Sequence, residues 1–325
     1  MEHVGDSTRL PQRQKPVLSI VLYFLMPAPF LPEALASVVS QLGPETEFIV
    51  VAGHAAGTDL GIDPDHLRQI DHLIVEPDPG AWDAANKGWQ IARGDWVQFF
   101  MSDDVLPAGS VAASLTELKN RSCDLVTGGI SFYQSDRDGQ RHFISHHNGR
   151  TLTLDRVLGE LRSPAVLYRR DLLERLGGFD GRFGYSHDRE LLLRAWQINA
   201  SSDILAHDVY AMRVHPDSRT LSGDKIVMLA YLQEHLALAD EALQHDGISA
   251  ADIRAVLHWR DEEALKYHIL RAIVRPRHDV PPASIAAPSP LRLLAAAGRI
   301  VLRKLTRKLQ RKAAQPLASI LELRG

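Results

Sequence analysis

The stretch from Glu76 to Asp104 constrains the fold of this chain more than any other part of it. After a turn rich in Pro and Gly, residues 83–92 have the composition and the apolar spacing of a helix. Gly94 ends that helix, and residues 96–101 (WVQFFM) form the aromatic and β-branched run that is typical of a buried strand. The strand leads into Ser102-Asp103-Asp104. A turn, a helix and a buried strand in this order predict an α/β domain.

Asp103 and Asp104 place two adjacent carboxylates at the carboxyl end of the predicted strand, where open α/β sheets bind their ligands. Because like charges repel, such a pair indicates a nearby cation. Mg²⁺ and Mn²⁺ take carboxylate and phosphate oxygens, and they often bind through one or two acids together with the phosphates of a substrate. The pair therefore predicts a divalent cation and a diphosphate substrate. For an isolated Ser-Asp-Asp tripeptide, a polar turn or a helix N-cap is the alternative.

The length and the composition bound the remaining possibilities. With 325 residues, 45% of them hydrophobic, the chain suits one large α/β domain with an appendage, or two domains. A net charge of -3 gives no reason to expect binding to nucleic acid. The single cysteine, Cys123, excludes an internal disulfide framework and fits a reducing compartment.

The termini and the apolar runs predict the location. Residues 1–15 are polar, and no run of 18 apolar residues occurs, so the sequence predicts neither secretion nor a membrane-spanning helix. We therefore expect the catalytic part to be cytoplasmic.

Three segments near the centre carry a resemblance to a known family. Residues 80–88 (GAWDAANKG), 94–96 (GDW) and 101–104 (MSDD) resemble the family 2 glycosyltransferases with the GT-A fold. They are most similar to the bacterial branch with segments of the type GIYDAMNKG, GDW and NSDD. A second block, residues 177–196, resembles the Gly-Gly-Phe-Asp turn of that family and the helix that follows it, and the resemblance spans roughly residues 17–222.

The resemblance implies a fold and an activity. The expected fold is a Rossmann-like, mostly parallel sheet flanked by helices, with a helical C-terminal appendage. The expected activity is transfer of a sugar, with inversion, from a nucleotide-diphosphate sugar to a hydroxyl acceptor, either a glycan or a glycolipid. Synthesis of a surface polysaccharide or a glycolipid at the inner face of a bacterial membrane is the implied setting.

The resemblance also implies roles for individual residues. Asp188 matches the general base, and the metal ligands, for Mn²⁺ or Mg²⁺, are expected to be Asp103, Asp104 and His215. The nucleotide sugar is expected to contact Asp78, Asp83, Asn86, Lys87 and Asp103. Each role has a structural alternative: Asp188 as an ordinary acid at a helix N-terminus, Asp83 as a helix cap, Lys87 as a solvated cation, and His215 as a strand-end histidine.

Two departures from the family pattern fall in the expected nucleotide pocket. The segment 51–58 (VAGHAAGT) lacks the acid that holds the base in the family, and residues 23–26 (YFLM) replace a Pro-Thr-Tyr-Asn type segment. Either the base is held differently, or donor binding is weakened or lost. A catalytically silent GT-A scaffold that binds glycan or a partner protein therefore remains an alternative. A nucleotidyltransferase is less favoured, because no Gly-rich loop with a basic residue follows the first strand.

Residues 133–153 are expected to form a polar hairpin or loop, which contains His142, His146 and His147; three histidines in six residues invite a metal interpretation. No cysteine or acid stands at ligand spacing in this loop, so solvated or acceptor-facing histidines are favoured.

The C-terminal third changes character. We expect a disordered tail at 1–16, a GT-A domain at 17–223, a helical extension at 224–275, a linker at 276–290 and a basic amphipathic tail at 291–325. On a helical projection of 291–309, one face carries Leu294, Val301, Leu302, Leu305 and Leu309, and the other carries Arg303, Lys304, Arg307, Lys308 and Arg311. This pattern predicts docking on an anionic membrane surface. Packing of the apolar face on its own domain or on a partner subunit is the alternative.

Overall fold

The computed structural model describes residues 15–25, 29–136, 139–216, 218, 224–274 and 289–301. The chain divides into two compact units between Ser222 and Gly223. The first unit contains the sheet, and the second is helical.

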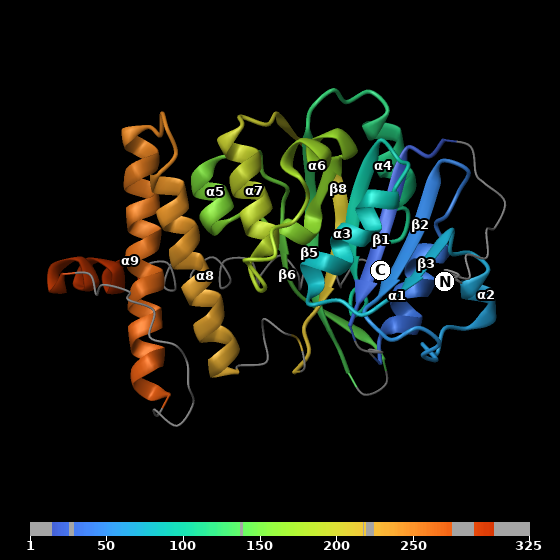
Figure 1. The fold of residues 1–325 in the computed structure, drawn as a ribbon, viewed down its shortest axis with the longest axis horizontal. Coiled ribbons are helices and arrows are strands. Elements are labelled where there is room, and N and C mark those ends of the chain that lie inside the picture. Colours follow the sequence, from blue (N-terminus) through green and yellow to red (C-terminus); the bar gives the residue numbers. More distant parts are fainter. Residues whose placement is uncertain are drawn as a thin grey trace, which may run out of the picture. The chain divides into compact units, whose positions relative to one another are not determined.

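The sheet of the first unit has eight strands in the described residues, in the order β3-β2-β1-β4-β7-β5-β6, with β8 paired to β5 (Figure 1). The strands β3, β2, β1 and β4 are mutually parallel, β5 and β8 are parallel, and β7 and β6 run antiparallel to their neighbours. The strands are β1 (Leu18–Phe24), β2 (Thr46–Ala52), β3 (His72–Val75), β4 (Trp96–Met101), β5 (Leu125–Ser135), β6 (Arg141–His147), β7 (Val166–Arg169) and β8 (Ser202–Arg213). The expected mostly parallel α/β fold is confirmed.

Helices cover both faces of the parallel part of the sheet. On one face, alternate residues of β1 such as Ile20 form a core with α1 (Leu31–Val39) and α4 (Ser110–Leu118). On the other face, α3 (Ala81–Ile91) packs over β1 and β2 (Figure 1). A Cβ on Gly88 of α3 would lie 2.2 Å from Val21, so glycine permits this close packing.

Shorter helices complete the first unit. They are α2 (Pro64–Leu67), α5 (Leu154–Gly159), the 3₁₀ turn η1 (Ser163–Ala165), α6 (Arg170–Leu176) and α7 (His187–Gln197). The helix α7 contacts α5, α6 and η1.

The second unit is built on a helical hairpin of α8 (Lys225–Leu243) and α9 (Ala250–Ile273). Asp224 caps α8 by accepting from the Ile226 N–H, and Ser249 caps α9 by accepting from the Asp252 N–H. A further helix spans 290–301, which is the described part of the expected helix 291–309; residues 302–309 lie outside the described residues. None of the helices in the described residues is long and apolar enough to span a bilayer.

Candidate functional site

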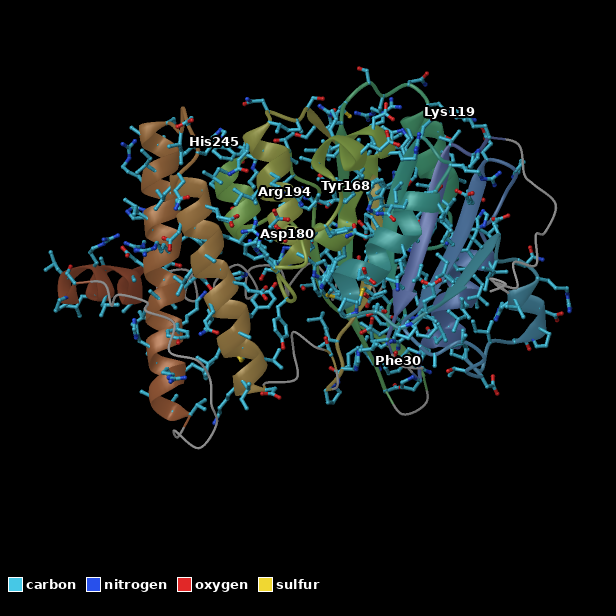
Figure 2. The ribbon with its side chains drawn as sticks, viewed as in Figure 1. Phe30, Lys119, Tyr168, Asp180, Arg194 and His245 are labelled. Atoms are coloured by element: carbon cyan, nitrogen blue, oxygen red, sulfur yellow. The ribbon has the colours of Figure 1, made fainter. Side chains whose placement is uncertain are left out.

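The expected site lies where the parallel strands end together. The pairing of Phe24 with Ala52, of Tyr23 with Met101 and of Ala52 with Val75 brings the carboxyl ends of β1, β2, β3 and β4 to one edge of the sheet. Figure 2 shows Phe30 near this end of the sheet and Lys119, which follows α4, near the opposite end. The loops that follow the four parallel strands therefore share one edge, as expected for a ligand site of an open α/β sheet.

Two of the three expected metal ligands lie together at this edge. His215, which follows β8, places Nε2 3.0 Å from Asp103 Oδ2. The side chains are only partly accessible, at 13% for His215 and 26% for Asp103. The ring of Phe30 packs 5.0 Å from that of His215 and covers one side of the pair. The sequence resemblance thus identified two residues that do meet, although they are 112 positions apart.

Asp104 does not point into the same space. Its side chain is 3% exposed, and it accepts hydrogen bonds from Tyr210 OH at 2.7 Å and from the Arg213 backbone N–H at 2.7 Å. Burial, reinforced by repulsion from Asp103, raises the pKa of Asp104 to about 8. Asp104 therefore does not stand at an exposed strand end, because residues of β8 cover it. In this structure Asp104 joins the end of β4 to β8.

The residues fit a cation that a substrate helps to hold. In the described part of the chain, no cluster of three or more His, Cys, Asp or Glu side chains could hold a metal ion by itself. Asp103 and His215 supply one carboxylate and one imidazole, and the oxygens of a diphosphate could supply further ligands, as is usual for Mg²⁺ or Mn²⁺ at phosphate sites.

The side chain of Arg213 connects several segments at this edge of the sheet. Its guanidinium donates to the Asp103 carbonyl oxygen at 3.0 Å, to Ser135 Oγ at 2.5 Å and to the Glu33 carboxylate. It also lies over the ring of Phe30, at 4.2 Å from the centroid. Sequence reasoning did not find Glu33, because nothing local in α1 indicates a partner 180 positions away.

Asp83 and Lys87 of α3, which are expected to contact the nucleotide sugar, form an ion pair with each other. Lys87 Nζ lies 3.1 Å from Asp83 Oδ2 and donates to the Pro77 carbonyl oxygen at 2.8 Å. Lys87 is therefore not a simply solvated cation. Both side chains keep about a quarter of their surface exposed, so they remain accessible to a ligand.

Asn86 has a structural contact that the sequence did not reveal. Its Nδ2 donates to the Phe179 carbonyl oxygen at 2.9 Å, and its Oδ1 accepts from the Phe179 N–H at 2.8 Å and from Trp89 Nε1 at 2.8 Å. The two sequence blocks that resemble the family therefore touch directly, through an amide that satisfies both polar groups of one backbone residue.

An acid does lie at the end of β2, although it comes from a different strand. Asp78 follows β3, and its Oδ2 would be only 2.0 Å from a Cβ on Gly53, which follows β2. Burial raises the pKa of Asp78, and this is partly offset by the Gly80 N–H, Lys87 and His54. A carboxylate from the next loop therefore lies beside segment 51–58, and the absence of a side chain at Gly53 leaves room for it.

Asp188 lies in the first turn of α7 and is half-buried. Its Oδ2 accepts a hydrogen bond from Ser163 Oγ, and its Oδ1 accepts from the Arg189 N–H at 2.7 Å. The pKa of buried Tyr168 is raised well above its usual range by burial and by the nearby charge of Asp188. Ser163 was not found from the sequence, since it stands 25 positions before Asp188 in an unremarkable Ser-Pro turn.

The histidine-rich segment forms part of a hairpin, β5–β6. His142 Nε2 lies 2.8 Å from Asp136 Oδ2, and His146 Nε2 lies 2.6 Å from Asp208 Oδ1. The side chains of His142 and His146 are 61% and 35% exposed, so both pairs lie at the surface, which agrees with the expectation of solvated or acceptor-facing histidines. Each forms a pair with one carboxylate, and Asp208 comes from β8, which sequence spacing within the loop could not reveal.

Comparison with known proteins agrees with the resemblance. Residues 19–177 match the glycosyl transferase family 2. The uncharacterized glycosyltransferase EpsJ of Bacillus subtilis (strain 168) is 24% identical over 250 residues, which cover 73% of this chain and 72% of EpsJ. The putative teichuronic acid biosynthesis glycosyltransferase TuaG of the same organism is 26% identical over 178 residues, 49% of this chain and 70% of TuaG.

A solved structure shares the fold over nearly the whole chain. The mannosyltransferase PcManGT from Pyrobaculum calidifontis, in complex with GDP-Man and Mn²⁺, superposes with a TM-score of 0.55 at 18% identity, covering 97% of this chain and 89% of PcManGT. At this level of identity the likeness concerns the fold alone.

Proposed function

Because residues 19–177 match the glycosyl transferase family 2, we propose that the chain transfers a sugar from a nucleotide-diphosphate sugar to a hydroxyl acceptor, with inversion at the sugar carbon. The observation that carries this proposal is the pair of Asp103 Oδ2 and His215 Nε2, 3.0 Å apart at the carboxyl edge of the parallel strands. The donor-bound state of PcManGT, with GDP-Man and Mn²⁺, supports a donor of this chemical class.

Asp103 and His215 hold Mn²⁺ or Mg²⁺ in this proposal, together with oxygens of the donor diphosphate. When bound, the cation offsets the negative charge that develops on the departing nucleoside diphosphate. Arg213 fixes the Asp103 backbone through its 3.0 Å hydrogen bond, so the carboxylate is positioned before the donor arrives. Asp104 does not contact the cation in this proposal. It connects the end of β4 to β8 through its hydrogen bonds with Tyr210 and the Arg213 N–H.

Asp188 is the proposed general base. It accepts the proton of the acceptor hydroxyl as the oxygen attacks the sugar carbon on the face opposite the diphosphate, which produces inversion. Ser163 Oγ hydrogen-bonds to Oδ2 and restricts the carboxylate orientation. A fixed orientation matters because proton transfer needs the base within hydrogen-bond reach of the hydroxyl.

The donor base and phosphates are proposed to bind along the neighbouring loops. Asp78 lies against Gly53 at the end of β2, where a carboxylate can accept N–H groups of a nucleobase. Asp83 lies in the first turn of α3, where backbone N–H groups favour anions, and Lys87 lies one turn further along; both side chains remain partly exposed. Asn86 contributes mainly by holding Phe179 in place.

The acceptor is proposed to be a growing surface polysaccharide or glycolipid, with the protein peripheral at the inner face of the cell membrane. The printed name of TuaG, which refers to teichuronic acid biosynthesis, supports a bacterial glycan as the acceptor class. The basic C-terminal segment supports a membrane location.

The test is a panel of UDP and GDP sugars with and without Mn²⁺, followed by thermal unfolding and by donor hydrolysis. We expect at least one nucleotide sugar to raise the unfolding temperature and to be consumed, and both effects to require the divalent ion. Stabilisation of equal size without the ion would remove the proposed metal role. If no donor is consumed, with or without acceptor extract, the result would contradict the proposed transfer and favour a catalytically silent binding scaffold.

A further inference from the structure

Three consecutive acids in the middle of α9 are the most unusual feature of the helical unit. Asp261, Glu262 and Glu263 are each 4% exposed. A buried carboxylate is costly unless a cation or a hydrogen-bond donor satisfies it. Successive helical positions point about 100° apart, so the three acids need partners on different sides of α9.

The three acids pair with cations from different elements. Glu263 pairs with His235 Nδ1 of α8 at 2.9 Å and with Lys266 Nζ at 2.5 Å. The other two pair with the helix 290–301: Arg292 lies 2.9 Å from Asp261, and Arg299 lies 3.1 Å from Glu262. The C-terminal helix therefore supplies cations to acids that α9 buries.

These ion pairs fix which side of the C-terminal helix faces α9. Arg292 and Arg299 are two turns apart on one side, and Ala296, which lies between them on that side, is fully buried. The opposite side carries Leu291, Leu294 and Val301, which we call the apolar face. These side chains are 80%, 72% and 56% exposed. The helix is thus held by its charged side, with its apolar side directed outward.

The sequence beyond the described helix continues the same pattern. Leu302, Leu305 and Leu309 fall in the helical phase of the apolar face, as the projection of 291–309 indicates. Residues 291–321 contain eight Lys or Arg and no Asp or Glu. A surface of the opposite charge is therefore the fitting partner. A second copy of this segment would bring like charges together, which disfavours self-association through this face.

We propose that Arg292 and Arg299 latch the C-terminal helix to α9, so that its apolar face docks on an anionic lipid bilayer. This inference rests on, and deepens, the membrane association proposed above, and it does not depend on the chemistry at Asp188. Leucines enter the acyl boundary while the basic side chains meet lipid phosphates, and the latch determines the orientation of the hairpin on the membrane.

The first experiment measures flotation of the full chain with phosphatidylcholine vesicles that do or do not contain phosphatidylglycerol. We expect binding only to the anionic vesicles, and we expect it to weaken with salt. The double variant Leu294→Ser with Val301→Ser should lower vesicle binding about tenfold or more, since it removes two exposed apolar groups that the bilayer would bury. Ile198→Ser is the matched control, because Ile198 is an exposed apolar residue of the sheet unit, and it should change nothing.

The second experiment separates the latch from simple electrostatic attraction. Asp261→Asn with Glu262→Gln keeps every cation and makes the chain more basic, so attraction alone predicts equal or stronger vesicle binding. The latch predicts weaker binding. Exchanging the members of one pair, Asp261→Arg with Arg292→Asp, should bind vesicles better than Asp261→Arg alone, which distinguishes a lost latch from a misfolded hairpin.

Several results would overturn the inference. Unchanged flotation of the Leu294 and Val301 variant would contradict docking of the apolar face on lipid. Unchanged or stronger flotation of the Asp261 and Glu262 variant would contradict the latch. If the unaltered chain does not bind vesicles but forms dimers, and the Leu294 and Val301 variant does not dimerise, the apolar face binds a second copy instead. Donor hydrolysis in solution is measured in parallel, so failure of docking is distinguishable from failure of the proposed transfer.

Discussion

At the scale of single residues, two neighbouring acids that look equivalent in the sequence have different surroundings. Asp103 is accessible and paired with His215, whereas Asp104 is buried and bonded to Tyr210 and the Arg213 N–H. The motif located both acids, but it could not show their exposure. The partners of Asp104 lie 106 and 109 positions away, and their contacts depend on the pairing of β8 with β5.

This difference predicts opposite outcomes for matched substitutions. Asp104→Ala leaves two buried donors without an acceptor, so it should lower the free energy of unfolding by about 1–3 kcal/mol. Asp103→Ala should change that free energy by less than about 0.5 kcal/mol, since the side chain is partly exposed. It should, however, abolish the Mn²⁺-dependent stabilisation by a nucleotide sugar. Denaturant unfolding and thermal shifts provide both readouts, and the reverse pattern would assign the cation to Asp104.

A second residue-scale prediction concerns Asp188 and Ser163. Asp188→Asn should lower the turnover number by about 10²-fold or more and leave the donor KM nearly unchanged, because a general base acts on the acceptor proton. Ser163→Ala should lower turnover by a smaller factor, again with little effect on donor KM, and Ser163→Thr should restore it by returning the hydroxyl. Steady-state kinetics with donor and acceptor varied separately measures this split. An Asp188→Asn enzyme that is slightly less stable but fully active would leave Asp188 as an ordinary helix acid.

At the scale of elements, the sequence predicted those whose signals are local. The helix α1 has Pro32 in its first turn, and α8 begins at the Asp224 cap; both are local signals for the start of a helix. The short strand β7 was not assigned as a strand, because four residues carry little periodicity and its place between β4 and β5 is set by long-range pairing. The hairpin containing β6 was expected only as a polar hairpin or loop.

The contact between the two sequence blocks is also an element-scale feature. Asn86 of α3 bonds to Phe179, and Trp82 packs against Gly181, where a Cβ would lie 2.7 Å from its ring. Each block looks like an independent motif in the sequence. In the fold they form one unit, in which α3 supports the turn that precedes α7.

This contact yields a prediction with a matched control in adjacent residues. Gly177 and Gly178 both have positive φ, at 72° and 74°. A Cβ on Gly177 meets nothing within 4 Å, whereas on Gly178 it lies 2.4 Å from Asn86 Oδ1 and 2.6 Å from Trp89 Nε1. Gly177→Ala should therefore lower the free energy of unfolding by only about 1–2 kcal/mol, the cost of placing a Cβ at positive φ. Gly178→Ala should cost about 1–3 kcal/mol more, because the Asn86 hydrogen bonds must shift.

Denaturant unfolding of the two glycine variants measures this difference. Equal losses of stability would mean that the Asn86 contact adjusts without cost. Asn86→Ala provides an independent check, since it should destabilise the same region and should make the Gly178→Ala change less costly, as expected for residues in contact.

At the scale of the whole molecule, the sequence predicted the α/β class, the family and a helical C-terminal region. It did not predict which side of the C-terminal helix contacts α9. The amphipathic pattern alone allows the apolar face either to dock on lipid or to pack on its own domain. The answer depends on Asp261 and Glu262, which lie in a different helix and give no local sign of being buried.

The helical unit should respond to acid through Glu263. Burial alone would raise the pKa of this carboxyl, but the hydrogen bond from His235 and the charge of Lys266 outweigh it and lower the pKa from its ordinary 4.5 to about 2. Because the folded state holds the ionised form, this stabilisation is fully present above about pH 4.5 and is lost as the pH falls towards 2. Its size is on the order of 3 kcal/mol.

Calorimetry of the full chain between pH 7 and pH 2.5 measures this stabilisation. The relevant unfolding transition is the one that nucleotide sugar and Mn²⁺ leave unshifted, since the proposed donor site lies in the sheet unit. Glu263→Gln should lower that transition at pH 7 and flatten its dependence on pH below 4.5, whereas Glu174→Gln, an exposed acid of the sheet unit paired with Arg170, should leave it unchanged. A Glu263→Gln protein whose helical transition still falls as steeply as that of the unaltered chain would show that other acids govern its acid sensitivity.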